Sequence, residues 1–160
     1  MDIFEAARTN NISLLREYIT DGQLNARDNR GSTPLIIAAY YNHSKAVDFL
    51  LKAGAKTELK DNLGHTALMG ACFKGHIDIV KLLLKKGASI STETDHGATA
   101  LTYAATFGHN DIIDLLLDNG ANPLKKKVMA KIKLITGLLG RILLPTKKQP
   151  AIMTESVSKA

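Results

Sequence analysis

Apolar residues recur along this chain with a period of 33 positions. Leu35, Leu68 and Leu101 are spaced by this step, and each belongs to a stretch of small and apolar residues. A second apolar stretch follows each of them, and its adjacent leucines repeat at the same step. Within each stretch the apolar positions have the spacing of one face of an α-helix. The pattern predicts three pairs of short helices, over residues 34–41 and 44–52, 67–74 and 77–85, and 100–107 and 110–118.

The residues between these helices repeat with the same period and supply start and stop signals. Thr33, Thr66 and Thr99 precede the first helix of each pair, where a hydroxyl caps free backbone N–H groups. Gly31 and its counterparts lie two positions earlier, in a turn that favours a positive φ. Gly54 and its counterparts follow the second helix as left-handed caps. One unit therefore consists of a turn, a helix pair and a terminating glycine.

A less regular unit precedes the three regular ones. Phe4, Ile12 and Leu15 belong to two short apolar faces, and Gly22 follows them. Polar residues on the other sides of these helices suit the end of a stack. A single unit of this length cannot bury its own apolar face, so neighbouring units must stack to form a core. We therefore expect four units within residues 1–124, at about 1–27, 28–60, 61–93 and 94–124, of which the first is an N-terminal cap.

Two stretches of the third unit carry a family resemblance. Residues 61–68 read Asp-Asn-Leu-Gly-His-Thr-Ala-Leu, and residues 75–88 begin with Gly-His and end with Leu-Leu-Leu-Lys-Lys-Gly-Ala. In these motifs the chain resembles the ankyrin repeat family over about residues 1–124. The resemblance implies an all-α solenoid of stacked helix-turn-helix pairs joined by β-hairpin-like turns. It also implies a non-catalytic scaffold that binds another protein.

The chain departs from the family pattern at two places in the repeat. Ile36, Met69 and Thr102 stand where the family usually has histidine, and we expect the lost side-chain hydrogen bond to lower repeat stability. Asn42 replaces the usual glycine before His43. Neither departure threatens the fold.

No combination of residues indicates catalysis or a metal site. His43, His76 and His109 precede the second helices, where we expect each imidazole to bond to backbone between neighbouring repeats. A separation of one full repeat along a solenoid keeps these three apart, whereas zinc needs converging ligands. His65 and His96 lie in different registers of the turns and leave a loose ligand pair as a minor alternative. The sequence predicts no enzyme activity, no cofactor and no bound metal.

The positions that vary between units indicate where a partner protein would bind. In the family that the chain resembles, partners mostly contact the concave face formed by turn tips and first helices. Aromatic and arginine side chains are enriched among interface anchors, although aromatic side chains at helix ends can instead pack on the neighbouring pair. Tyr103 is not included because it could equally fill the space between repeats. The predicted partner-binding residues are Arg8, Asn29, Arg30, Ser32, Tyr40, Tyr41, Asn62, Leu63, His65, Phe73, Lys74, Asp95, His96, Thr106 and Phe107.

Charge is distributed unevenly along the chain. Residues 1–124 contain 12 Lys and Arg against 14 Asp and Glu, whereas residues 125–160 contain 9 against 1. Residues 125–144 combine this basic charge with an apolar stripe at helical spacing, and residues 145–160 are expected to be disordered. The predicted helix at 125–144 either caps the last repeat or lies on an anionic membrane, which would make the protein a membrane-surface adaptor. Nucleic acid is a less favoured partner because the basic residues are not interleaved with aromatic ones.

No stretch of the sequence indicates export or a membrane span. The first eight residues have acidic side chains and lack the apolar core of a signal peptide. The most apolar stretch, residues 134–144, is too short and too interrupted to cross a bilayer. Cys72 is the single cysteine, so an intrachain disulfide is impossible, and its small-residue surroundings predict burial. The sequence predicts a cytoplasmic monomer, with a secreted effector as the alternative.

Overall fold

The computed structural model describes residues 2–123, and this part of the chain folds into paired helices without a strand. The predicted helices are confirmed, except that the one expected over 34–41 ends one residue early, at Tyr40. The less regular first unit also forms a helix pair. The helices are α1 (Ile3–Arg8), α2 (Ile12–Thr20), α3 (Pro34–Tyr40), α4 (Ser44–Lys52), α5 (Ala67–Lys74), α6 (Ile77–Lys85), α7 (Ala100–Phe107) and α8 (Asn110–Asp118).

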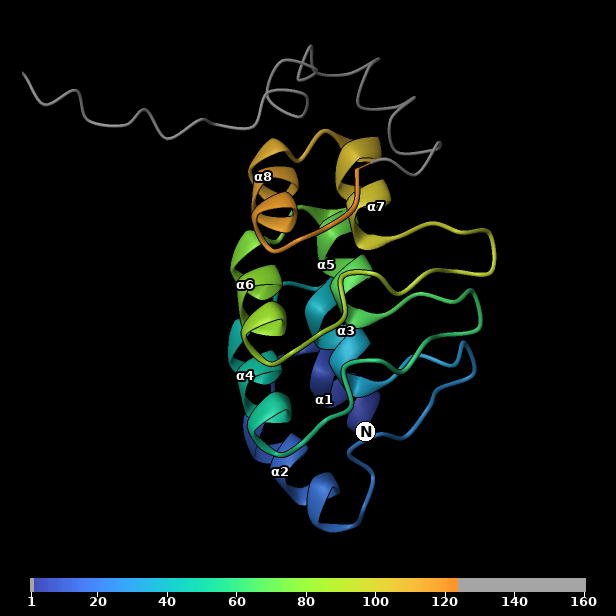
Figure 1. Cartoon of the computed structure of the whole chain (residues 1–160). Coiled ribbons are helices and arrows are strands. Elements are labelled where there is room, and N and C mark those ends of the chain that lie inside the picture. Colours follow the sequence, from blue (N-terminus) through green and yellow to red (C-terminus); the bar gives the residue numbers. More distant parts are fainter. Residues whose placement is uncertain (1, 124–160) are drawn as a thin grey trace, which may run out of the picture.

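The helix pairs stack one upon another in the same orientation. Figure 1 shows α1, α3, α5 and α7 in one column, which we call the inner helices, and α2, α4, α6 and α8 in a second column, the outer helices. The loops before α3, α5 and α7 project to one side of the inner column. We call residues 28–32, 61–65 and 94–98 the hairpin loops, because one backbone hydrogen bond of 2.8–3.0 Å joins the two ends of each. The predicted all-α solenoid is confirmed.

A buried threonine begins each of the inner helices α3, α5 and α7. The hydroxyl oxygens of Thr33, Thr66 and Thr99 accept hydrogen bonds from the third residue of the helix at 3.3–3.4 Å. In α7 the Thr102 hydroxyl also accepts a hydrogen bond from the Thr99 backbone N–H at 3.1 Å, which completes a reciprocal cap. The expectation that Thr102 leaves its repeat without a side-chain hydrogen bond at this position was therefore wrong, because its hydroxyl accepts one from the Thr99 backbone.

A residue with positive φ separates the inner from the outer helix in every pair. Gly75 and Gly108 have φ of 79° and 73° at this point, and Asn42 has φ of 61°. Asn10 occupies the corresponding place in the first pair with φ of 56°. Asparagine is among the few residues other than glycine that adopt this region readily. Asparagine in place of the usual glycine at position 42 consequently leaves the turn geometry unchanged.

The core runs through the stack and is built from aliphatic and small side chains. Leu50 and Leu83 of the outer helices are fully buried, as are Ala38 and Ala104 of the inner helices. Cys72 occupies one of these small-residue positions with no exposed surface, and burial raises the pKa of its thiol. A thiol held in the protonated form is a poor nucleophile. The interpretation of Cys72 as a buried packing residue is confirmed.

The histidines before the outer helices connect neighbouring repeats. His43 Nε2 lies 2.7 Å from the Arg8 carbonyl oxygen, and His76 Nε2 lies 3.1 Å from the Tyr40 carbonyl oxygen. His109 repeats the contact at 3.1 Å with the carbonyl of the next inner helix end. These carbonyls lie at helix C-termini, where backbone acceptors lack intrahelical partners. The predicted backbone role of the three histidines is confirmed.

The burial of His76 makes stability depend on pH. Burial lowers the pKa of His76, nearby Lys74 and His109 lower it further, and the hydrogen bond to Tyr40 opposes them. Because the folded protein favours the neutral imidazole, its stabilising contribution is present above the unfolded pKa of about 6.5 and is lost as pH falls. We expect the free energy of unfolding of the wild type to fall between about pH 7.5 and about pH 5.5. Urea unfolding of His76→Asn in the same buffers should show a smaller fall, and an identical fall would contradict this assignment.

Two predictions concern parts of the chain outside the described residues. The basic helix expected at 125–144, whether as a cap or as a membrane contact, belongs to them, and so does the disordered segment expected at 145–160. Within residues 2–123, no helix has the length and apolar character needed to cross a membrane.

Candidate functional site

An aspartate organises each of the first two hairpin loops. Asp28 Oδ1 accepts hydrogen bonds from the backbone N–H groups of Arg30 and Ser32 at 2.9 and 2.8 Å. Asp61 Oδ1 makes the two equivalent bonds in the next loop, also at 2.9 and 2.8 Å. Bonds from an aspartate to its own following backbone are a common way of fixing a tight turn. The two carboxylates are thus engaged by their own loops.

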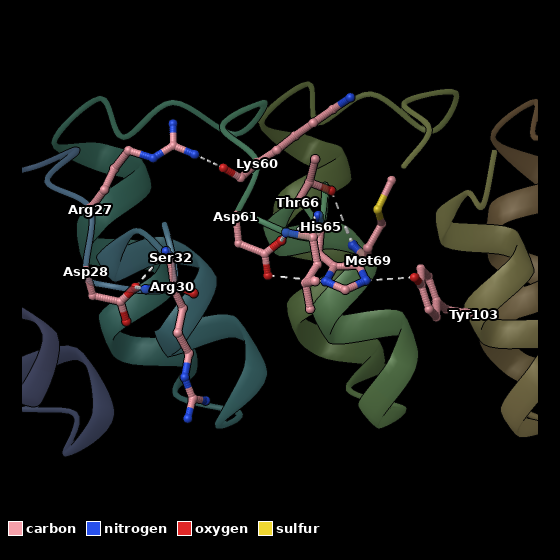
Figure 2. Close-up of polar contacts among 11 residues, drawn as sticks. Arg27, Asp28, Arg30, Ser32, Lys60, Asp61, His65, Thr66, Met69 and Tyr103 are labelled. Atoms are coloured by element: carbon pink, nitrogen blue, oxygen red, sulfur yellow. Dashed lines mark hydrogen bonds and ion pairs between the residues drawn. The ribbon is translucent and has the colours of Figure 1, made fainter. Parts of the chain in front are cut away.

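Hydrogen bonds also join neighbouring loops in a ladder along the stack. The Asn62 backbone N–H donates to the Arg30 carbonyl oxygen at 2.9 Å. At the base of the loops the Arg27 guanidinium donates to the Lys60 carbonyl oxygen (Figure 2), and Lys60 Nζ donates to the Glu93 carbonyl oxygen at 2.8 Å. Residues 27, 60 and 93 occupy the same place in successive repeats. The ladder fixes the spacing of the loops.

The first two hairpin loops and the inner helices line an open groove of about 1100 Å³. Its floor is apolar and includes Ile36, Ile37 and Met69. Gly70 lies among them without a side chain, and a Cβ there would meet only the Tyr40 ring, at 3.9 Å. Ligand sites are typically concave and mostly apolar, with a few placed polar groups. The groove has this composition and is the candidate functional site.

A row of aromatic rings runs along the ends of the inner helices. The Tyr40 ring lies 5.4 Å from that of Tyr41 and 6.1 Å from that of Phe73, measured between centroids. The Phe73 ring in turn contacts Phe107 at 4.5 Å and Tyr103 at 6.3 Å, in both cases edge to face. Offset and edge-to-face pairs are the favoured aromatic arrangements. Each repeat from the second to the fourth therefore contributes to one continuous aromatic surface.

The large apolar side chains that stay exposed are gathered on this side of the described chain. They are Leu63, which is 70% exposed at a loop tip, and Tyr40, Tyr41 and Phe107, which are 39%, 48% and 49% exposed. All four belong to a hairpin loop or to the end of an inner helix. Contiguous exposed apolar surface on a small protein commonly marks an interaction site.

A short polar chain crosses the groove wall between the second loop and α7. His65 Nδ1 lies 3.2 Å from Asp61 Oδ2, and His65 Nε2 lies 2.8 Å from the Tyr103 hydroxyl (Figure 2). In the tautomer that carries its proton on Nδ1, the His65 ring donates a hydrogen bond to the Asp61 carboxylate and accepts one at Nε2 from the Tyr103 hydroxyl. Burial raises the pKa of Tyr103, and the Asp61 carboxylate raises it further, so the hydroxyl stays protonated. The arrangement orients the His65 ring and supplies no phenolate nucleophile.

The structure gathers most of the predicted partner-binding residues along the groove. Lys74 and Phe107 lie beside it, since Lys74 Nζ is 5.3 Å from the Tyr40 ring centroid and Phe107 packs on Phe73. Asp95, His96 and Thr106 belong to the fourth unit and do not line it. The predicted residues that do line it are Arg8, Asn29, Arg30, Ser32, Tyr40, Tyr41, Asn62, Leu63, His65 and Phe73.

Other groove residues were not predicted from the sequence. Tyr103 lines the groove, and so do Gly70 and Ile37, which hold the equivalent position one and two repeats earlier. The same holds for Ile36 and Met69, which are equivalent to each other. The 33-residue period of the sequence could have identified these residues, because it relates positions 37, 70 and 103 and positions 36 and 69. Once one member of such a set lies in the groove, its equivalents in the neighbouring repeats are candidates, but the equivalents of Leu63 and Phe73 in the fourth unit, His96 and Thr106, do not line it.

Metal ligands do not gather in the described part of the chain. Residues 2–123 contain no group of three or more His, Cys, Asp or Glu side chains able to hold a metal ion. His65 is hydrogen-bonded to Asp61 and Tyr103 instead.

A second cavity of about 250 Å³ lies near the end of α8, where Leu101 and Ala121 are among its lining residues.

One family model matches this sequence. It describes ankyrin repeats in three copies, and it matches residues 3–94 and residues 54–127. The two matches overlap and together extend over all the helices and hairpin loops described above.

Proposed function

Because the chain belongs to the ankyrin repeat family, whose members generally bind other proteins, we propose that it binds a partner protein through the groove between its hairpin loops and inner helices. The proposed contact residues are the ten predicted residues that line the groove, together with Tyr103 from its wall and Lys74 and Phe107 beside it. The proposed repeat bounds are those given by the period of the sequence.

The distribution of exposed apolar side chains carries this proposal. In residues 2–123 the exposed large apolar side chains lie in a hairpin loop or at inner helix ends, and the outer helices have none. Aromatic residues are enriched in the buried centres of interfaces, where a few of them dominate the binding energy. Tyr40, Tyr41 and Phe73 provide three such rings side by side.

The hydrogen bonds between repeats support the same proposal, because they order the groove before a partner binds and so lower the entropic cost of binding. The loop ladder and the histidine contacts tie the groove walls to one another at several points. Ordering of loops and side chains is a major cost of association, and a surface that is already ordered avoids part of it. The groove therefore suits a partner that adapts its shape to a stiff surface.

Site-specific crosslinking tests which face the partner contacts. A photoreactive phenylalanine analogue is placed at Tyr41 in the groove or, as the matched control, at Tyr18 on the outer helix α2. The full chain is expressed in the cells that naturally produce it and irradiated. We expect a discrete crosslinked product from position 41 and none from position 18, and mass spectrometry identifies the partner. Crosslinking from position 18 alone would place the interface on the outer helices and contradict the proposal.

A further inference from the structure

The charged side chains of the groove differ in whether a ligand can use them. Its carboxylates are those of Asp28 and Asp61, and each accepts two backbone hydrogen bonds from its own loop. Asp61 also contacts the His65 ring through its second oxygen. Asp61, with both oxygens engaged, therefore has fewer acceptor sites left for a cationic ligand than Asp28, whose loop bonds both go to Oδ1.

The cations of the groove are more available. Arg30 is exposed at a loop tip, and no side-chain partner is present for its guanidinium among the described residues (Figure 2). Arg8 pairs with Glu5 at 2.6 Å, but both side chains are 40% exposed, and such surface pairs contribute little in water. Lys74 adds a third positive charge beside Tyr40. A ligand entering this groove meets arginines that can bind carboxylates in a bidentate manner.

The two arginines line the same groove from different elements. Arg30 precedes the N-terminus of α3, whereas Arg8 ends α1. The hydrogen bond from Arg8 to Glu5 is the main cause that raises the pKa of Arg8, and a smaller contribution comes from the nearby Tyr41 hydroxyl. The apolar side chain of Ile37 and the Tyr40 ring line the same groove. Two arginines and a set of apolar and aromatic side chains are therefore presented to a ligand in one groove.

Resting on the proposed function, we infer that the groove binds an acidic polypeptide segment in which apolar or aromatic side chains are flanked by carboxylates. The apolar side chains pack on the Tyr40, Tyr41 and Phe73 rings, and the carboxylates pair with Arg30 and Arg8. A nucleic acid fits less well, because backbone binding requires several free cations in succession, and the hairpin carboxylates would face its phosphates.

Peptide selection with the full chain tests this composition. A display library of short random peptides is panned against the immobilised protein, and the best peptide is titrated by fluorescence anisotropy. We expect enrichment of Asp and Glu next to large apolar residues. We also expect affinity for that peptide to fall when salt rises from about 50 to about 300 mM, because exposed charge pairs are screened. A single-stranded oligonucleotide of similar length serves as a second probe, and its tighter binding would overturn the inference.

Charge reversal separates this inference from the proposed function. Arg30→Glu should weaken binding of the selected peptide by about tenfold or more, since it replaces an attraction by a repulsion. Lys81→Glu, which makes the same charge change on the exposed face of α6, should leave it unchanged. Equal effects of the two variants, or selected peptides that are basic or uncharged, would overturn the acidic partner and leave the groove proposal standing. Selected peptides that bind the Tyr41→Ala, Phe73→Ala double variant as tightly as the wild type would instead overturn the groove itself.

Discussion

Replacing Gly31 by alanine is expected to lower the free energy of unfolding by about 3 kcal/mol, whereas Gly54→Ala should cost only about 1–2 kcal/mol. Both glycines have positive φ, of 74° and 92°, so each substitution places a side chain in the left-handed region. At Gly54 no atom lies within 4 Å of the added Cβ. At Gly31 the Cβ would meet the Asn62 side-chain oxygen and would lie 2.9 Å from the Asn62 backbone nitrogen.

The difference between the two variants measures the contact between hairpin loops. Asn62 donates its backbone N–H to the Arg30 carbonyl oxygen at 2.9 Å and its side-chain amide to the Asn29 carbonyl oxygen at 3.3 Å. A side chain at position 31 must displace Asn62 and break both bonds. Because a repeat protein is held together by contacts between neighbours, this damage weakens the coupling of the second and third repeats.

Urea unfolding followed by circular dichroism distinguishes the two effects. We expect Gly54→Ala to shift the midpoint with little change in the slope of the transition. Gly31→Ala should shift the midpoint further and broaden the transition, because the repeats on either side of the weakened junction no longer unfold together. Equal destabilisation by the two substitutions would show that the loops do not approach as closely as the structure has them.

The sequence predicted the helices well because their signals are local and repeated. The threonine caps, the apolar helical faces and the terminating glycines each recur once per repeat, so chance agreement is small. The exchange at Asn42 was also interpretable, since asparagine tolerates a positive φ. The expectation for Thr102 was wrong because it considered only that threonine replaces histidine, and not which hydrogen bonds the threonine hydroxyl can make. The Thr102 hydroxyl accepts a hydrogen bond from the Thr99 backbone N–H, which the comparison with histidine did not take into account.

The groove was only partly predictable because its shape depends on contacts between repeats. Tyr41 and Leu63, predicted as partner-binding because they vary between units, lie in its lining, whereas the groove does not reach the loop of Asp95 and His96, which were chosen by the same criterion. The link between His65 and Tyr103 joins residues 38 positions apart, and no local pattern reports such a pair. The sequence also does not show which charged groups are available to a ligand. Only the hydrogen bonds of the folded chain show that Asp61 is engaged by its own loop, whereas the Arg30 guanidinium is available.

Removing two rings of the groove is expected to abolish most of the affinity for the partner protein. Tyr41 is 48% exposed, and Phe73 lies at the centre of the aromatic row, in contact with Tyr40, Tyr103 and Phe107. Interface anchors of this type each contribute about 2 kcal/mol or more, so Tyr41→Ala with Phe73→Ala should weaken binding by about 100-fold or more. Calorimetric titration of the partner identified by crosslinking measures this loss.

A matched double variant separates lost contact from lost stability. Tyr18 and Phe49 lie on the outer helices α2 and α4 and are half-buried, and Phe49 packs under the Arg16 guanidinium at 5.4 Å. Tyr18→Ala with Phe49→Ala therefore also removes one tyrosine and one phenylalanine, but from the outer helices and not from the groove. We expect this control to lower the melting temperature at least as much as the groove variant while affinity stays near that of the wild type. If the two double variants lost affinity to the same extent at equal helical content, the groove would not be the contact surface, because the loss would then follow stability alone.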